Sequence, residues 1–202
     1  MSLRLGFGPM FSNKTKHLFA WIETYMQKGL ECLLVNYQDD TRYGRGVAST
    51  HKNALGEQVQ LPATCTADLN AIRDQLLSVD VIGIDEIQFF PNCVKLIREL
   101  VHAGKRVFVV GLDSDYKQQS FPGSCLPELI PLAHSVEKYL AVCDFCPVGE
   151  GPHKAPMSWR IVADAETKVI GGSDKYGAIC HHCLKAPVKT PRIRVQRTVT
   201  PI

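Results

Sequence analysis

Over the first two-thirds of this 202-residue chain, short apolar runs alternate with amphipathic segments. The apolar runs predict buried strands at residues 3–7, 32–37, 79–85 and 106–111. The segments between them carry apolar residues at helical spacing, which predicts helices at residues 14–26, 68–77 and 92–103. Strands that alternate with helices pair in parallel and are covered on both faces, so we expect an α/β fold. Ligands of such sheets bind beyond the carboxyl ends of the strands.

The pattern changes after Pro131. Short strand-like pieces, glycines and cysteine pairs replace the helices, which predicts a small β-rich lobe at residues 136–185. Residues 186–202 contain prolines and basic side chains but no acid. This composition predicts a disordered tail.

Composition narrows the class of protein. The net charge of +3 and the pI near 8.4 are only mildly basic, and the basic residues form no recognisable nucleic-acid-binding motif. We see no apolar run long enough for a membrane span, and the start of the chain lacks the layout of a signal peptide. We therefore expect a soluble, cytoplasmic protein without membrane or nucleic-acid partners.

The segment Gly8-Pro-Met-Phe-Ser-Asn-Lys-Thr15 differs in one residue from the phosphate-loop pattern G-x-x-x-x-G-K-[ST]. A predicted strand precedes it and a predicted helix follows. Backbone N–H groups would face the phosphates of ATP, Lys14 would reach the outer phosphates, and the Thr15 hydroxyl would bind Mg²⁺. Asn13 replaces the second glycine; asparagine tolerates left-handed conformations, but its side chain takes space beside the phosphates. Residues 1–135 are therefore predicted to form a P-loop nucleotide-binding domain.

Asp85 and Glu86 follow a buried strand and would lie beside this loop. One acid can support Mg²⁺, often through water, while the other takes the proton of an acceptor hydroxyl as general base. A solvated cap at the end of a strand is the ordinary alternative. In combination with the phosphate loop, the pair indicates phosphoryl transfer.

Four of the eight cysteines form two C-x-x-C pairs. Two such turns supply four thiolates to a tetrahedral Zn²⁺ and leave no open position for catalysis, which predicts a structural zinc site. Either His181 or His182 could replace a cysteine, and four ordinary reduced cysteines are the alternative. The predicted ligands are Cys143, Cys146, Cys180 and Cys183. The other cysteines are expected to be ordinary core or loop residues: Cys32, Cys65, Cys93 and Cys125.

Three further segments carry weaker signals. Residues 40–42 follow the second strand, where Arg42 could stabilise charge on a transferring phosphoryl group; a surface turn is the alternative. The Gly-Gly at 171–172 permits close backbone approach to a ligand, or forms a simple hairpin turn. The loop aromatics Tyr116 and Phe121 could stack on a planar base, or cover the edge of the core.

Six motifs occur in the order found in thymidine kinases of the tetrameric, zinc-containing type. They are Gly-Pro-Met-Phe-Ser-x-Lys-Thr, Asp-Thr-Arg-Tyr, Ile-Asp-Glu-x-Gln-Phe-Phe, Gly-Leu-Asp, Ala-Val-Cys-x-x-Cys and Val-Ile-Gly-Gly-Ser-Asp-Lys-Tyr. The chain resembles this family from about residue 3 to residue 185. The resemblance implies ATP-dependent phosphorylation of the 5′-hydroxyl of thymidine, a P-loop parallel sheet flanked by helices, a zinc-binding lasso lobe and a homotetramer.

The resemblance also implies roles for single residues. Glu86 is the general base. ATP and Mg²⁺ are bound by Gly8, Pro9, Met10, Phe11, Ser12, Asn13, Lys14, Thr15, Asp40, Thr41, Arg42, Asp85, Ile87 and Gln88. The nucleoside is held by Tyr116, Phe121, Thr167, Lys168, Val169, Ile170, Gly171 and Tyr176. Ser158 matches a small hydroxyl residue near the base, and the four paired cysteines match the zinc ligands.

The chain departs from the family pattern at several positions. Besides Asn13, Ile87 stands where a glycine gives the backbone freedom, Phe19 stands where a methionine lines the nucleoside pocket, and residues 122–127 carry an insertion. Two functions stay open: a thymidine kinase, and a catalytically silent homologue that acts as a binding or structural subunit. Retention of the loop lysine, the arginine and the presumed base favours the kinase.

Overall fold

The computed structural model describes residues 1–40, 46–50, 57–147, 149–162 and 171–185. Its centre is a six-stranded sheet in the order β5-β2-β6-β7-β1-β8, in which all neighbouring strands are parallel. The strands are β1 (Ser2–Phe7), β2 (Cys32–Tyr37), β5 (Thr64–Thr66), β6 (Val81–Ile84), β7 (Arg106–Gly111) and β8 (Ser135–Lys138). The predicted fold class, a parallel sheet of the P-loop type flanked by helices, is confirmed.

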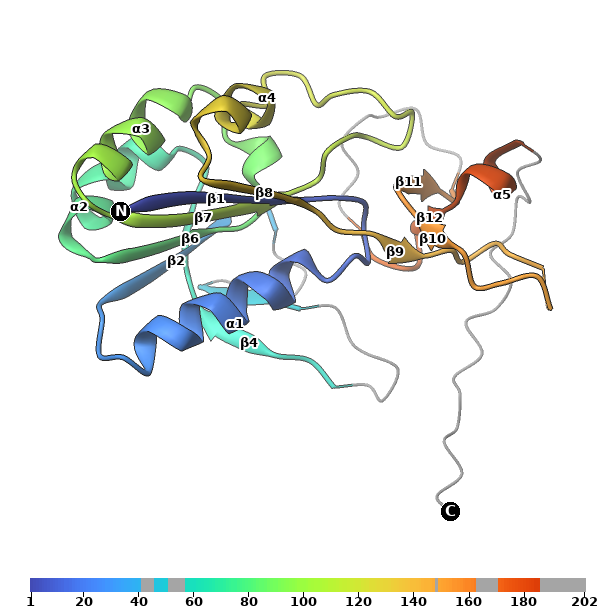
Figure 1. Cartoon of the computed structure of the whole chain (residues 1–202), viewed down its shortest axis with the longest axis horizontal. Helices are drawn as coiled ribbons and strands as arrows, with labels where there is room; N and C mark the ends of the chain where they lie inside the picture. The colour runs from blue at the N-terminus through green and yellow to red at the C-terminus, as the bar shows by residue number, and fades with distance from the viewer. Residues whose placement is uncertain (41–45, 51–56, 148, 163–170, 186–202) are drawn as a thin grey trace, which may run out of the picture.

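Helices cover both faces of this sheet (Figure 1). Helix α1 (Lys14–Met26) lies on one face, and the other carries α2 (Arg73–Ser78), α3 (Val94–His102) and α4 (Leu126–Leu129). Short 3-10 segments lie at Leu69–Ile72, Ile87–Phe89 and Ile130–Leu132. Adjacent residues of β6 face different apolar clusters: Val81 belongs to the one beneath α1 and Ile82 to the one beneath α3. This alternation explains why the inner strands read as continuous apolar runs.

Helix α1 approaches the sheet closely because β6 carries a glycine. A Cβ at Gly83 would lie 2.7 Å from Ile22 Cδ1, so a larger residue would displace the helix. Since α1 follows directly from the loop after β1, this packing fixes the phosphate loop relative to the end of β6. The phosphate loop and the Asp85–Glu86 pair are thereby brought side by side.

The edges of the sheet and a separate hairpin were not predicted. Strand β8 pairs with β1 although all four of its residues are exposed, and its sequence Ser-Val-Glu-Lys lacks the apolar run of an inner strand. The sheet therefore continues past residue 135, where the first domain was predicted to end. Strands β3 (Val47–Ser49) and β4 (Gln60–Pro62) form a separate antiparallel hairpin.

A small β-rich lobe lies beyond the sheet in the C-terminal part of the chain (Figure 1). Its elements are β9 (Ala141–Val142), β10 (Lys154–Ala155), β11 (Met157–Arg160), β12 (Tyr176–Ile179) and α5 (His181–Lys185). Strand β9 pairs with β10 and β11 pairs with β12, both antiparallel. The apolar core of this lobe contains Phe145 and Met157 together with the paired cysteines. The predicted tail, residues 186–202, lies outside the described residues.

Cys93 and Cys125 were expected to be ordinary residues, and this expectation is wrong. They form a disulfide with a Cα–Cα distance of 6.3 Å, and both are buried. The pairing joins the start of α3 to the residue before α4. Sequence alone gave no sign of it because the fold brings together two cysteines that are 32 residues apart.

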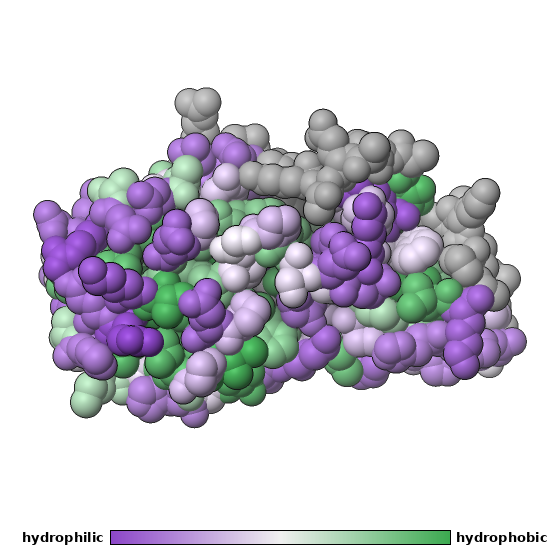
Figure 2. Space-filling model, turned by 90° about the horizontal axis from the view of Figure 1, so that it is seen from above, coloured by the Kyte–Doolittle hydropathy of each residue, from purple (hydrophilic) through white to green (hydrophobic). Residues whose placement is uncertain are grey.

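Figure 2 shows the molecule from the side of α3 and α4, where hydrophilic residues are interspersed with smaller apolar patches. Within the described ranges, no helix combines the length and the apolar character needed to cross a bilayer.

Candidate active site

The loop between β1 and α1 has left-handed backbone at two residues. Phe11 has a φ of 64° and Asn13 a φ of 62°. Asparagine enters this region more readily than most other non-glycine residues. Asn13 therefore supplies the conformation for which the full motif uses glycine, and its side chain is exposed.

Lys14 is buried, and its ammonium group is held within the same loop. Nζ donates a hydrogen bond to the Pro9 carbonyl at 2.7 Å and lies 3.4 Å from Ser12 Oγ. The Ser12 hydroxyl also donates to the Pro9 carbonyl, at 2.8 Å. The backbone passes close to Tyr139 at Gly8, where a Cβ would lie 2.2 Å from the Tyr139 carbonyl oxygen. The loop is thus kept in shape by hydrogen bonds within it and by the close approach of the Tyr139 backbone.

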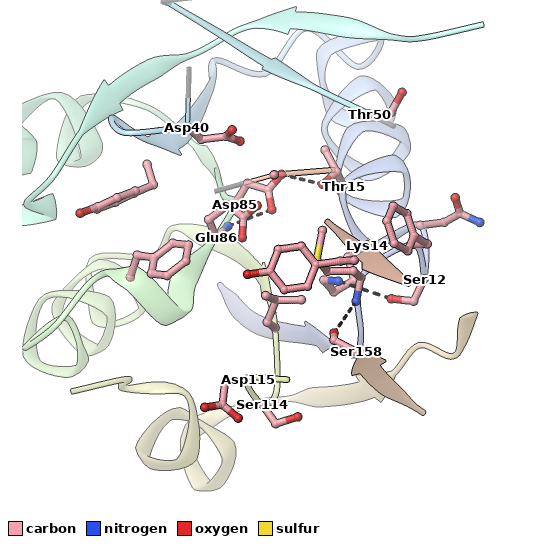
Figure 3. A pocket seen from close by; sticks show the side chains of 18 of the residues that line it. Ser12, Lys14, Thr15, Asp40, Thr50, Asp85, Glu86, Ser114, Asp115 and Ser158 are labelled. Atoms are coloured by element: carbon pink, nitrogen blue, oxygen red, sulfur yellow. Dashed lines mark hydrogen bonds between the residues drawn. The ribbon is translucent and has the colours of Figure 1, made fainter. Parts of the chain in front are cut away.

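Asp85 follows β6 and faces the start of α1 (Figure 3). Its Oδ2 accepts a hydrogen bond from the Thr15 hydroxyl at 2.7 Å, and its Oδ1 accepts one from the Glu86 N–H at 2.8 Å. Burial, with a contribution from the neighbouring Glu86 charge, raises the pKa of Asp85 to about 7. A cation placed against Thr15 and Asp85 would favour the charged carboxylate.

Glu86 itself is the left-handed residue after β6, with a φ of 55°. Gln88 Nε2 donates to Glu86 Oε2 at 2.5 Å, while Gln88 Oε1 accepts from the Leu112 N–H at 2.9 Å. The buried amide of Gln88 therefore orients the carboxylate of Glu86 from behind.

Ile87, which the resemblance places where a glycine gives the backbone freedom, does not have a left-handed backbone in this structure. Ile87 starts a 3-10 turn, and its side chain is fully buried in the core. The glycine that matters here is Gly111, where a Cβ would lie 2.3 Å from Gln88 Oε1 and 2.7 Å from Ile87 Cγ2. The end of β7 thus leaves room for both side chains.

One pocket collects these groups at the carboxyl end of the sheet (Figure 3). The predicted site residues on its wall are Met10, Phe11, Ser12, Asn13, Lys14, Thr15, Asp40, Asp85, Glu86, Tyr116, Phe121, Gly171 and Tyr176. The predicted residues that are described but do not line it are Gly8, Pro9, Ile87 and Gln88. The predicted residues that lie outside the described ranges are Thr41, Arg42, Thr167, Lys168, Val169 and Ile170.

Sequence reasoning missed part of this wall. The additional residues come mainly from the ends of strands and the loops after them: Lys16, Tyr37, Ser49, Thr50, Phe89, Leu112, Ser114 and Asp115. Their place in the sequence, directly after strands, could have indicated them, because residues after the carboxyl ends of parallel strands face the ligand-binding edge of the sheet. Ser158 also lines the pocket, and its Oγ accepts a hydrogen bond from the Met10 N–H at 3.0 Å. This bond ties the C-terminal lobe to the phosphate loop.

The paired cysteines form a cluster that could hold a metal ion. The four sulfur atoms lie within 4.8 Å of one another, and three of the residues are buried. Burial and hydrogen bonds with the other cysteine sulfurs raise the pKa of the Cys183 thiol, so a thiolate at this position needs a nearby cation. His181 and His182 are exposed and do not belong to the cluster. Four sulfur donors at this separation fit a tetrahedral Zn²⁺.

Comparisons with known proteins decide the family. A family model for thymidine kinase matches residues 1–184, and the chain is 40% identical over 181 residues to the thymidine kinase of Myxoma virus (strain Uriarra), covering 90% of this chain and 94% of the relative. This chain belongs to the thymidine kinase family.

The family also includes a cellular relative. The cytosolic thymidine kinase of Homo sapiens is 37% identical over 176 residues, which cover 87% of this chain and 70% of that protein. Among solved structures, a DNA replication initiation factor matches 69% of this chain and 40% of its own at 16% identity, with a TM-score of 0.41. That likeness is too weak to carry an argument.

One departure from the thymidine kinase pattern lies away from the pocket. Phe19, which the family resemblance places at the position of a methionine that lines the nucleoside pocket, has its side chain buried in the apolar cluster beneath α1. It is not on the pocket wall.

Proposed function

We propose that this chain transfers the γ-phosphoryl group of ATP to the 5′-hydroxyl of thymidine. The observation that carries the proposal is a single pocket shared by the phosphate loop, the Asp85–Glu86 pair and the aromatic residues Tyr116, Phe121 and Tyr176. Membership of the thymidine kinase family gives the substrate. No observation favours the silent alternative.

On the phosphate side, Lys14 reaches the outer phosphates of ATP after leaving the Pro9 carbonyl. Thr15 and Asp85 hold Mg²⁺, and Asp40, in the segment after β2, lines the same pocket. Arg42, two residues further along the chain, would stabilise charge on the transferring phosphoryl group. The metal, when bound, neutralises charge that develops on the phosphates. The hydrogen bond between Thr15 and Asp85 keeps these two oxygen atoms, the proposed ligands of the metal, next to each other in the pocket.

On the acceptor side, Glu86 takes the proton from the 5′-hydroxyl. Its carboxylate lines the pocket next to Asp85, and Gln88 holds it in one orientation. A base fixed within reach of the hydroxyl contributes roughly 10²–10⁴-fold to the rate.

The nucleoside occupies the part of the pocket that Tyr116, Phe121 and Tyr176 line. Aromatic rings on this wall offer apolar faces for a planar base. The segment 167–170 would contribute backbone contacts, as the family resemblance implies, and Gly171 at its end lines the pocket.

Product formation tests this function. The purified chain is incubated with thymidine and Mg-ATP, and thymidine monophosphate is measured by chromatography. We expect product from the parent chain and a similar rate from Asn13→Gly, because Asn13 already has the conformation of the glycine. An inactive parent alongside an active Asn13→Gly would establish the silent alternative and assign its cause.

We also propose one structural Zn²⁺ per chain, a homotetramer without nucleic-acid partners, and a cytoplasmic location. The edge strand β8 supports self-association, since Val136, Leu140 and Val142 are exposed along it and just beyond it and an unpaired edge invites a partner. Analytical ultracentrifugation distinguishes a four-chain particle from a monomer.

A further inference from the structure

The two faces of strand β11 have different neighbours. Met157 and Trp159 pack against the apolar core of the C-terminal lobe. Because side chains alternate along a strand, Ser158 and Arg160 share the opposite face. Ser158 binds the phosphate loop through the Met10 N–H. Arg160 therefore lies on the face that meets the α/β domain.

Arg160 connects two aromatic residues of the pocket wall. Its side chain is buried, and Nη2 donates a hydrogen bond to the Tyr176 hydroxyl at 2.8 Å. Its guanidinium carbon lies 3.9 Å from the centre of the Tyr116 ring. Tyr176 is opposite Arg160 in the register of β11 and β12, whereas Tyr116 belongs to the loop after β7. One buried cation thus joins the lobe to a loop of the α/β domain.

This arrangement has a consequence for the pocket. A guanidinium stacked on an aromatic ring covers one face of that ring and resists its rotation. Tyr116 and Tyr176 line the pocket, but Arg160 does not. Arg160 acts from behind the wall, and Lys117 Nζ lies over the same ring at 5.5 Å. The part of Tyr116 that lines the pocket is left for the ligand.

We propose that Arg160 is a positioning residue that holds Tyr116 in place to stack on the base of the nucleoside. The inference rests on the proposed function and adds a determinant of nucleoside affinity to it. Since Arg160 contacts Tyr116 and Tyr176, which line the nucleoside part of the pocket, its loss raises KM for thymidine and leaves kcat and KM for ATP close to their parent values.

The test compares Arg160→Met and Arg160→Lys with the parent chain in steady-state kinetics. Arg160→Met keeps the length of the side chain but removes the cation, and we expect KM for thymidine to rise by about 3- to 30-fold. Arg160→Lys keeps the charge without the planar group and restores part of the affinity. The matched control is Arg106→Met, which removes an arginine stacked 5.5 Å from the Tyr25 ring at the other end of the sheet; its kinetics stay unchanged.

A double-mutant cycle separates positioning from a general effect on folding. If Arg160 acts through Tyr116, adding Arg160→Met to Tyr116→Leu raises KM for thymidine no further than Tyr116→Leu alone. Independent, multiplicative effects would overturn the proposal. So would an unchanged KM for thymidine in Arg160→Met, or equal rises in both KM values accompanied by loss of zinc.

Equilibrium binding covers the case in which the parent chain transfers no phosphate. Thymidine is then titrated calorimetrically into the parent and into Arg160→Met. Weaker binding by the variant supports the positioning role even though the proposed kinase activity has failed. Equal binding overturns the positioning role, and absence of binding by the parent overturns both proposals.

Discussion

At the scale of single residues, Asn13 decides whether the phosphate loop is a working site. Its left-handed backbone shows that the turn of the loop survives the loss of glycine. Its exposed side chain leaves the burial of Lys14 and the contacts of Ser12 intact. The replacement of glycine by Asn13 therefore changes the exposed surface of the loop more than its backbone conformation.

We predict that Asn13→Gly binds a non-hydrolysable Mg-ATP analogue within about threefold of the parent, whereas Asn13→Ala binds roughly tenfold less tightly. Left-handed backbone costs a residue such as alanine about 1–2 kcal/mol, whereas asparagine enters this conformation more readily. Calorimetric titration of the three proteins measures the difference. Binding by Asn13→Gly alone would show that the asparagine side chain blocks the site.

Asp85 gives the stability of the metal-free protein a pH dependence. Because its pKa is raised from 3.8 to about 7 in the folded state, unfolding releases a proton between these values, and the free energy of unfolding falls as pH rises from about 4 to 7. The fall is of the order of a few kcal/mol. We predict that Asp85→Asn flattens it.

Urea denaturation of parent and variant at pH 5 and pH 8, in magnesium-free buffer, checks this prediction. If the free energy of unfolding changed with pH to the same extent in both proteins, Asp85 would not be the cause of the pH dependence. Added Mg²⁺ should reduce the fall in the parent but not in Asp85→Asn, since only the parent keeps the carboxylate.

At the residue scale, sequence reasoning could single out motifs whose members are neighbours in the chain. The phosphate loop, the Asp85–Glu86 pair and the cysteine turns can each be recognised from a few consecutive residues. It failed where the role depends on distant partners: Gln88 acts by joining Glu86 to Leu112, and the Cys93–Cys125 pair joins two loops. No local pattern carries such information.

At the scale of elements, the buried parallel strands were predictable because both of their faces must be apolar. Strand β8 was missed because it lies at the edge, where Ser135 and Glu137 face solvent without cost. The helix predicted at 68–77 is a 3-10 turn followed by α2, and the structure ends it at Ser78. Edge strands and short helical turns depend on tertiary contacts more than on the hydrophobic periodicity of the sequence.

The C-terminal lobe supports the phosphate loop as well as itself. Phe11 of that loop packs against the apolar cluster that contains the paired cysteines, and Ser158 accepts a hydrogen bond from Met10. Loss of metal from the cysteine cluster should therefore be felt at the phosphate end of the pocket.

We predict about one zinc ion per chain by elemental analysis, and its loss in Cys143→Ser. Because binding energy at a structural site is folding energy, Tm falls by roughly 5 °C or more, and KM for ATP rises as the support of Phe11 loosens. The control is Cys65→Ser, which alters a cysteine outside the cluster. A parent without zinc, or a variant with parent Tm and KM, would contradict the assignment.

At the scale of the whole molecule, two units of different construction share one pocket. The α/β sheet supplies the phosphate loop and the two acids, and the β-rich lobe supplies Ser158 and Tyr176. The sheet could be predicted from the chain because it is built from repeated local patterns. The closure of the pocket could not, since it depends on contacts such as Arg160 with Tyr116 between segments far apart in sequence.

The most direct test of the account is a single-turnover measurement of phosphoryl transfer to thymidine by the parent and by Glu86→Gln. We predict rapid formation of thymidine monophosphate by the parent, a rate lower by at least about 100-fold in Glu86→Gln, and similar thymidine binding by both. Undiminished transfer by Glu86→Gln, or none by the parent, would contradict the account.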